Sequence, residues 1–226
     1  MKTVAIIVAG GSSSRFGDKI PKQFQTIADK PLLSHTIIKF ENATLVDKVI
    51  VVVAEEFLIY SAEKIIDPYD FKKVEKVVIG GETRQESVKN GLIACPSGTE
   101  YVAIHDGARP LVSVNDINKV IETAMEERAA ILAIRTTNTV KQVKDDYIIS
   151  TPDRTDLYQA QTPQVFQYDM IKDAYEKYND SDNFTDDASL LEKTGLKIKV
   201  IEATSPNIKI TTKDDLKLAE LLLKGN

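Results

Sequence analysis

The sequence predicts a single α/β domain over residues 1–226, built on a mainly parallel, twisted β-sheet with helices on both faces. Apolar runs recur along the chain at residues 3–9, 48–53, 76–79, 101–104 and 130–135. Segments of helical periodicity separate most of these runs, which is typical of βαβ units. No internal repeat, low-complexity tract or linker marks a second domain. In open sheets of this class ligands bind beyond the carboxyl ends of the strands, so we expect the functional site there.

The first expected strand, residues 3–9, runs directly into a loop of small residues. The loop reads Gly10-Gly-Ser-Ser-Ser-Arg15-Phe-Gly17 and is followed by Pro21-Lys22-Gln23. Glycines let consecutive backbone N–H groups turn toward one anion, and Arg15 and Lys22 add positive charge. Neither common glycine-rich nucleotide fingerprint is present. The segment therefore predicts a phosphate-binding loop of another kind, and the alternative is a flexible turn with two solvated cations.

Helical periodicity predicts the elements that connect the strands, at residues 33–40, 57–66, 84–94 and 115–128. We expect Asn115 to cap the last of these. Near the end of the chain, Thr212-Lys-Asp-Asp215 has the form of a capping box and opens a helix over residues 216–223.

Two further polar clusters follow expected strands. The segment from Gly80 to Ser87 would let a planar or phosphorylated ligand approach the backbone, although most Gly-Gly pairs are simple turns. Asp106 offers a carboxylate that can bind a hard metal ion, and Arg109 offers a guanidinium that can pair with phosphate. Both lie at the same edge of the expected sheet. Asp106 would suit Mg²⁺, and the alternative is a local ion pair between these two residues.

The remaining polar residues divide into scaffold and candidate site. His105 should point to the face opposite Asp106, so we interpret it, like His35, as structural. Lys209, flanked by Ile208 and Ile210, faces either a polar cavity or solvent. A third polar cluster, Gln159-Ala-Gln161-Thr162-Pro163-Gln164, lies where a scaffold gives little reason for it.

Residues 138–155 alternate polar and apolar side chains on both sides of Asp145-Asp146, which predicts a β-hairpin. An isolated two-stranded ribbon is marginally stable, so its apolar positions must pack on something. A second subunit is one candidate, and the hairpin's own domain is the other.

Composition narrows the classes of function and partner. The net charge of −5 argues against a protein that binds nucleic acid mainly through phosphates. Cys95 is the only cysteine, so there is no disulfide framework or cysteine-based zinc motif. The sequence shows neither a signal peptide nor a run of membrane-spanning length. We expect a cytoplasmic protein with no nucleic-acid or membrane partner.

No nucleophile, base and orienting group can be assembled as a set from this sequence. The chain offers cations, a carboxylate and backbone donors instead. These are the parts of phosphoryl or nucleotidyl transfer, in which the protein positions the substrates and stabilises charge.

Nine short motifs, taken in order, resemble one family over the whole length of the chain. They are Val8-Ala-Gly-Gly-Ser-Ser-Ser-Arg15-Phe-Gly, Pro21-Lys22-Gln-Phe, Gly80-Gly-Glu-Thr-Arg84-Gln-Glu-Ser-Val, His105-Asp106-Gly-Ala-Arg109-Pro, Asn138-Thr139-Val-Lys, Asp153-Arg154, Gln161-Thr162-Pro-Gln, Thr185-Asp-Asp-Ala-Ser and Asn207-Ile-Lys209-Ile-Thr. Together they resemble the 2-C-methyl-D-erythritol 4-phosphate cytidylyltransferases. Each motif is short, but nine in one order are highly specific.

The resemblance implies a Rossmann-like domain that joins CTP to 2-C-methyl-D-erythritol 4-phosphate, with Mg²⁺ as cofactor, in the non-mevalonate isoprenoid pathway. It implies catalytic roles for Arg15, Lys22 and Lys209. The implied nucleotide-binding residues are Ala9, Gly10, Gly11, Ser12, Ser13, Ser14, Gly81, Glu82, Arg84, Ser87 and Gly107. The implied residues for the second substrate are Asp106, which would also hold the metal, Arg109, Thr139, Arg154, Thr162, Thr185 and Lys209.

Family members resemble one another in being homodimers whose hairpin arm reaches the neighbouring subunit, which would bring Thr139 and Arg154 into that subunit's pocket. This chain departs from the family's usual first loop, Ala-Ala-Gly-x-Gly-x-Arg, at Gly10 and Ser13. Gly10 also occurs in the related ribitol-5-phosphate cytidylyltransferases, which are the alternative function. A nucleotide-binding regulator without turnover is a second alternative, and a dehydrogenase is disfavoured because the glycine fingerprint is missing.

Overall fold

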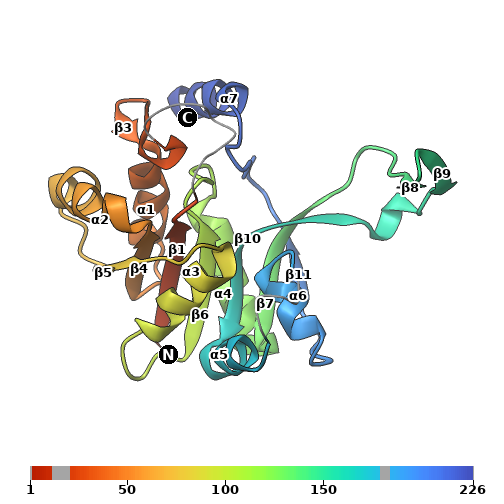
Figure 1. Cartoon of the computed structure of the whole chain (residues 1–226), viewed down its shortest axis with the longest axis horizontal. Helices are drawn as coiled ribbons and strands as arrows, with labels where there is room; N and C mark the ends of the chain where they lie inside the picture. Colours follow the sequence, from red (N-terminus) through yellow and green to blue (C-terminus); the bar gives the residue numbers. More distant parts are fainter. Residues whose placement is uncertain (1, 12–20, 179–183, 226) are drawn as a thin grey trace.

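A seven-stranded β-sheet forms the centre of the computed structural model, which describes residues 2–11, 21–178 and 184–225 (Figure 1). The strand order is β11-β7-β10-β6-β1-β4-β5, and β10 runs antiparallel to both of its neighbours while the other pairs are parallel. The strands are β1 (Thr3–Ala9), β4 (Lys48–Val53), β5 (Val74–Ile79), β6 (Tyr101–Asp106), β7 (Ala129–Arg135), β10 (Tyr158–Gln167) and β11 (Lys199–Glu202). The predicted mainly parallel α/β sheet is confirmed.

Alternate side chains of the buried strand β1 pack into two separate cores, one on each face of the sheet. Ala5 and Ile7 belong to the core covered by α1 (Leu32–Asn42) and α4 (Val114–Glu127). Val4 and Ile6 belong to the core covered by α3 (Arg84–Ile93), α5 (Tyr168–Lys177) and α6 (Asp187–Glu192). Because β1 is buried on both faces, it appears in the sequence as a continuous apolar run.

A smaller third core lies beneath the C-terminal helix α7 (Lys213–Lys224). It joins α7 to the short ribbon of β2 (Thr26–Ile27) and β3 (Lys30–Pro31), and it includes Ile27, Ile210 and Ala219. The predicted capping box is present, because Thr212 Oγ1 accepts a hydrogen bond from Asp215 N and the Asp215 side chain accepts one from Thr212 N.

Two helix predictions need correction. Asn115 does not cap α4, because Ser113 two residues earlier does so by accepting a hydrogen bond from Asp116 N at 3.0 Å. Residues 57–66 are helical but not one regular helix. A 3₁₀ turn at Glu55–Phe57 leads into α2 (Leu58–Tyr60), a π-helical segment at Ser61–Ile66 and another 3₁₀ turn at Asp67–Tyr69.

The strand β10 was not predicted from the sequence, although it lies in the middle of the sheet. Proline is rare in central strands because it lacks a backbone N–H. Here Pro163, which follows a cis peptide bond, lies at a register shift between Ala160 and Gln164, where the ladder with β7 is interrupted. The polar cluster around Pro163 is therefore part of the sheet.

The predicted hairpin is β8 (Gln142–Lys144) and β9 (Tyr147–Ser150), joined through Asp145 and Asp146, both at positive φ. Positive φ at both central residues gives the turn the twist that suits an antiparallel pair. The hairpin, which we call the arm, projects away from the sheet and does not fold back on its own domain (Figure 1). Its apolar side chains are largely exposed, namely Val143, Tyr147, Ile148 and Ile149.

Within the ranges described, no helix combines the length and apolar character needed to cross a membrane.

Candidate active site

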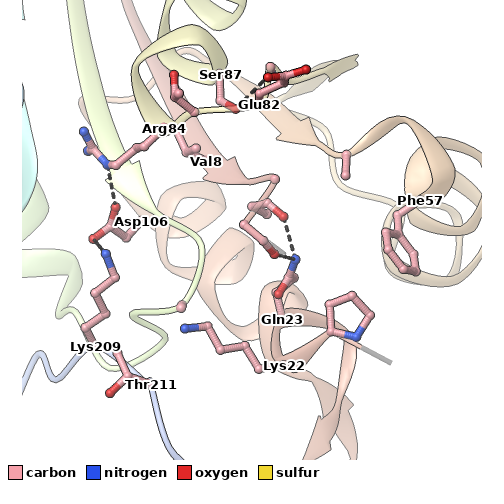
Figure 2. A pocket seen from close by; sticks show the side chains of 18 of the residues that line it. Val8, Lys22, Gln23, Phe57, Glu82, Arg84, Ser87, Asp106, Lys209 and Thr211 are labelled. Atoms are coloured by element: carbon pink, nitrogen blue, oxygen red, sulfur yellow. Dashed lines mark hydrogen bonds and ion pairs between the residues drawn. The ribbon is translucent and has the colours of Figure 1, made fainter. Parts of the chain in front are cut away.

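A pocket of about 550 Å³ opens at the carboxyl ends of β1, β4, β5 and β6 (Figure 2). Its lining comes from all of the predicted strand-end clusters, as far as they lie in the described ranges. The lining residues include Ala9, Gly10, Gly11, Lys22, Gln23, Phe57, Gly81, Glu82, Arg84, Ser87, Asp106, Lys209 and Thr211. A pocket therefore lies at the edge of the sheet where the sequence predicts the site.

Gln23 secures the start of the loop that follows β1. Its Nε2 donates to Ala9 O at 2.7 Å and to Gly11 O at 3.2 Å, and the side chain is buried. Gln23 belongs to a 3₁₀ turn, Lys22–Phe24, whose Phe24 ring packs on Phe57 at a centroid distance of 4.8 Å. This anchoring directs the Lys22 side chain into the pocket, as Figure 2 shows. Arg15 and the serines at 12–14 lie outside the described residues.

Asp106, at the end of β6, is the centre of a cluster of three cations. Arg84 Nε lies 3.1 Å from its Oδ1, and Lys209 Nζ and Arg109 Nε lie 2.9 and 3.4 Å from its Oδ2. The local Asp106–Arg109 ion pair therefore exists, but within a larger cluster. Burial alone would raise the pKa of Asp106, yet the charges of Arg84, Lys209 and Arg109 outweigh it and hold that pKa well below its usual range.

Arg84 is held by a second carboxylate, Asp187, which we did not single out from the sequence. The guanidinium Nη1 and Nη2 donate to the two Asp187 oxygens at 3.1 and 2.8 Å, and Tyr175 OH donates to Asp187 Oδ1 at 2.6 Å. Burial disfavours the charged guanidinium, but Asp187 and Asp106 outweigh this and raise the pKa of Arg84 above its usual range. The Thr185-Asp-Asp motif was the available signal for Asp187.

The segment before α3 forms the wall of the pocket opposite Lys22. Ser87 Oγ accepts a hydrogen bond from Gly81 N at 3.1 Å, and a β-carbon at Gly80 would lie only 2.6 Å from the same Oγ. At Gly81 a β-carbon would come within 2.2 Å of Glu86 Cβ. Because Glu86 also accepts hydrogen bonds from the amides of Glu82 and Thr83, the glycines are needed for this close packing.

Lys209 faces the pocket because its neighbours face the third core. Ile210 is fully buried beneath α7, Ile208 packs against the same cluster, and the ammonium group points the other way, toward Asp106 (Figure 2). The backbone is fixed on both sides, since Ile210 N donates to Ala108 O and Arg109 Nη1 donates to Asn207 O. Of the two predicted environments, the polar cavity is confirmed.

Comparisons with known proteins agree with this geometry. Residues 3–225 match the family model described as IspD, 2-C-methyl-D-erythritol 4-phosphate cytidylyltransferase. The chain belongs to this family. It is 42% identical to the 2-C-methyl-D-erythritol 4-phosphate cytidylyltransferase of Syntrophus aciditrophicus, across 99% of this chain and 96% of that one. As a member of this family, the chain is a nucleotidyltransferase.

Solved structures of the cytidylyltransferase family share the fold. The Anaerococcus prevotii 4-diphosphocytidyl-2C-methyl-D-erythritol synthase superposes with a TM-score of 0.87 at 32% identity, covering 99% of this chain and 96% of that one. The Francisella tularensis 2-C-methyl-D-erythritol 4-phosphate cytidylyltransferase gives a TM-score of 0.81 at 34% identity, covering 98% of this chain and 99% of that one.

Several site residues predicted from the cytidylyltransferase resemblance lie away from this pocket. Thr139 and Arg154 are exposed at the base of the arm, where Arg154 Nη1 donates to Thr137 O at 2.7 Å. Thr185 is exposed just before α6. Thr162 is buried behind Asp106, and its hydroxyl accepts a hydrogen bond from Asp106 N at 3.0 Å. Gly107 packs against Ala9 and Leu33, where a β-carbon would lie about 3.0–3.1 Å from their side chains.

Asp106 fits a metal ion only if the substrates supply most of the ligands. The described part of the chain contains no group of three or more His, Cys, Asp or Glu side chains that could hold a metal. Mg²⁺ is commonly bound by one or two carboxylates together with substrate phosphates and water. A deprotonated Asp106 at the pocket wall satisfies this minimal requirement.

Proposed function

We propose that this enzyme joins CTP and 2-C-methyl-D-erythritol 4-phosphate to give 4-diphosphocytidyl-2-C-methyl-D-erythritol and pyrophosphate. The observation that carries the proposal is the cluster of Arg84, Arg109 and Lys209 around Asp106, with Lys22 in the same pocket, in a chain that matches the family from end to end. Several cations at the ends of parallel strands suit a reaction between two phosphate-bearing substrates.

In the proposed mechanism the phosphate of the polyol attacks the α-phosphorus of CTP in line, and pyrophosphate leaves. No covalent enzyme intermediate is formed. Lys22, together with Arg15, stabilises the negative charge that develops on the five-coordinate phosphorus, and Lys209 serves both catalysis and the second substrate. The loop that begins at Gly10 cradles the phosphates, while Gly81, Glu82 and Ser87 surround the nucleoside.

Asp106 would hold Mg²⁺ on the triphosphate, and the ion would neutralise charge on the phosphate oxygens. The protein's own contribution is to keep Asp106 ionised and oriented. Arg84, Arg109 and Lys209 do this through the three ion pairs described above.

We also propose that two copies of the chain form a homodimer through the arm, so that Thr139 and Arg154 of one subunit serve the other subunit's pocket. The exposed Tyr147, Ile148 and Ile149 support this, because an isolated ribbon gains too little from burial to be stable. Inactive Lys22→Ala and Arg154→Ala subunits, when mixed, should regain activity in hybrid dimers. Absence of recovery after confirmed subunit exchange would indicate that each site is complete within one chain.

Two more general features follow from the same proposal. One continuous sheet supports a single nucleotidyltransferase domain over residues 1–226. The proposed enzyme uses CTP and acts in isoprenoid biosynthesis, and both properties agree with a location in the cytoplasm.

The decisive experiment measures pyrophosphate release from CTP and Mg²⁺ with 2-C-methyl-D-erythritol 4-phosphate and ribitol 5-phosphate in parallel. We expect faster turnover with the erythritol phosphate. Faster turnover with ribitol 5-phosphate would favour the sister activity. Tight CTP binding without product from either polyol phosphate would identify a nucleotide-binding regulator.

A further inference from the structure

The backbone N–H of Asp106 lies where the ladder between β6 and β10 stops. The paired residues of the two strands end at Ile104 and Gln164, so the ladder supplies no acceptor for this N–H. A buried backbone donor without an acceptor is unfavourable, because it has lost its hydrogen bond to water and gained none in return. The hydroxyl of Thr162 supplies the missing acceptor, because its Oγ1 lies 3.0 Å from Asp106 N.

The same hydroxyl continues the hydrogen-bond chain to His105. Thr162 Oγ1 lies 3.0 Å from His105 Nδ1, and His105 Nε2 lies 3.2 Å from Arg109 O. A carbonyl can only accept, so Nε2 carries the hydrogen, and in a neutral imidazole Nδ1 is then bare. Nδ1 must therefore accept the hydroxyl hydrogen of Thr162, which leaves a lone pair of that hydroxyl for the Asp106 amide.

His105 is fully buried, and its ring packs on Phe40 at a centroid distance of 4.8 Å. Burial lowers the pKa of His105 to about 3, so the imidazole is neutral at neutral pH. Of the charged groups nearby, Asp106 raises the pKa of His105 and Arg109 lowers it, and His105 does not line the pocket. It can affect the reaction only through the groups that it holds.

We propose that His105 is a positioning residue that acts through the Thr162 hydroxyl to fix the Asp106 backbone, and with it the carboxylate at the centre of the cation cluster. The inference rests on the proposed function, in which Asp106 would hold Mg²⁺ on the triphosphate. It also gives Thr162 a task besides the one implied by the family resemblance, since its hydroxyl donates to His105 and accepts from Asp106 N inside the protein.

The kinetic test is a double-mutant cycle between His105→Gln and Thr162→Val. Glutamine can keep a donor near the Arg109 carbonyl but removes the Nδ1 acceptor, and valine keeps the shape of threonine without the hydroxyl. Each single variant should lower kcat by about 10- to 100-fold, the range found when a group that orients a metal-ligating residue is lost. The double variant should be little worse than either single variant, because both interrupt the same chain.

Controls separate positioning from general damage and from substrate contact. Thr162→Ser keeps the hydroxyl and should restore most of kcat. His35→Gln changes another histidine whose Nε2 bonds a backbone carbonyl, at 2.8 Å, but which is not linked to Asp106, and it should leave kcat unchanged. Additive losses, or a Thr162→Val variant that only raises KM for the polyol phosphate, would overturn the proposal.

A second measurement does not depend on turnover. Nitrogen NMR of the wild-type imidazole at neutral pH should show a protonated Nε2 and a bare Nδ1 at His105, and amide exchange at Asp106 should be faster in His105→Gln than in His35→Gln. A protonated Nδ1 or unchanged exchange would overturn the proposal. If the wild-type enzyme turns over neither polyol phosphate, the proposed function fails while this hydrogen-bond chain is still decided by the NMR result.

Discussion

The pocket and the arm differ in how their side chains are held: charged groups are paired within the chain in the pocket, whereas apolar groups are exposed in the arm. In the pocket, Asp106 and Arg84 are fixed by partners from the same chain, with Asp187 fully buried behind them. In the arm, Tyr147 is 78% exposed and Ile148 is 64% exposed. A buried ionic cluster is held by its own ion pairs and hydrogen bonds. An exposed apolar ribbon is stabilised only when another surface packs against it. The cation cluster of the pocket is therefore preorganised within one chain, whereas the arm is not.

The largest effect should come from removing the buried partner of Arg84. Asp187→Ala leaves a guanidinium with one carboxylate instead of two, and breaking a buried pair in this way typically costs about 3–5 kcal/mol. We expect a loss at the lower end of that range in the free energy of unfolding, measured with urea, because Arg84 keeps Asp106 as an ion-pair partner. Glu202→Ala is the matched control at the base of the arm, where Glu202 pairs with Arg135 at 3.1 Å but both side chains are half exposed.

That control should change the free energy of unfolding by no more than about 1 kcal/mol, since exposed pairs contribute little. Equal losses in the two variants would contradict the distinction between a buried, preorganised pocket and an exposed arm.

Acid should lower the free energy of unfolding through His105, which is buried beneath the pocket. The arm contains no histidine and should not contribute to this effect. Burial lowers the pKa of His105 to about 3 from its ordinary value of about 6.5, so between these values only the unfolded chain binds the proton. The free energy of unfolding must therefore fall as pH falls from 6.5, by about 3 kcal/mol at pH 4. Burial also lowers the pKa of His35, which acts in the same direction.

Urea unfolding at pH 7, 5.5 and 4 measures this dependence. The His105→Gln variant should show a flatter profile over the same range. An identical pH profile in that variant would mean that His105 is not the group responsible.

Removing a single cation from the pocket should affect the reaction more than the fold. Lys22→Ala should lower kcat at least about a hundredfold, or about 2.7 kcal/mol, which is typical for loss of one transition-state donor. Lys119→Ala, an exposed lysine on α4, is the control and should retain full activity. Steady-state pyrophosphate release measures both. A near-normal kcat in Lys22→Ala would remove this residue from the proposed catalytic role.

The sequence predicted the parts of this comparison that depend on local pattern. The run at residues 3–9 and the alternation around Asp145-Asp146 each describe their element without knowledge of the rest of the chain. The strand-end rule then placed the candidate site, and Lys209 faces the pocket for the predicted reason, alternation with buried isoleucines.

What the sequence did not predict depends on contacts between distant segments. Asp187 lies 103 residues from Arg84, and β10 contains a proline that local rules exclude from a central strand. Both features depend on the assembled sheet. A register shift in the ladder accommodates Pro163, and the N-terminus of α6 brings Asp187 beneath Arg84.

The smallest effect on stability and the sharpest test of the arm should come from Ile148→Asp. Because Ile148 is largely exposed within one chain, the substitution should change the free energy of unfolding of the monomer by no more than about 0.5 kcal/mol. In the proposed dimer the same carboxylate would be buried against apolar groups, so sedimentation or light scattering should report dissociation. Ile93→Asp makes the same change at a side chain that is 68% exposed at the end of α3, and it should leave the oligomer intact. If Ile148→Asp stays associated, or if Ile93→Asp dissociates equally, the arm is not the surface through which two copies meet.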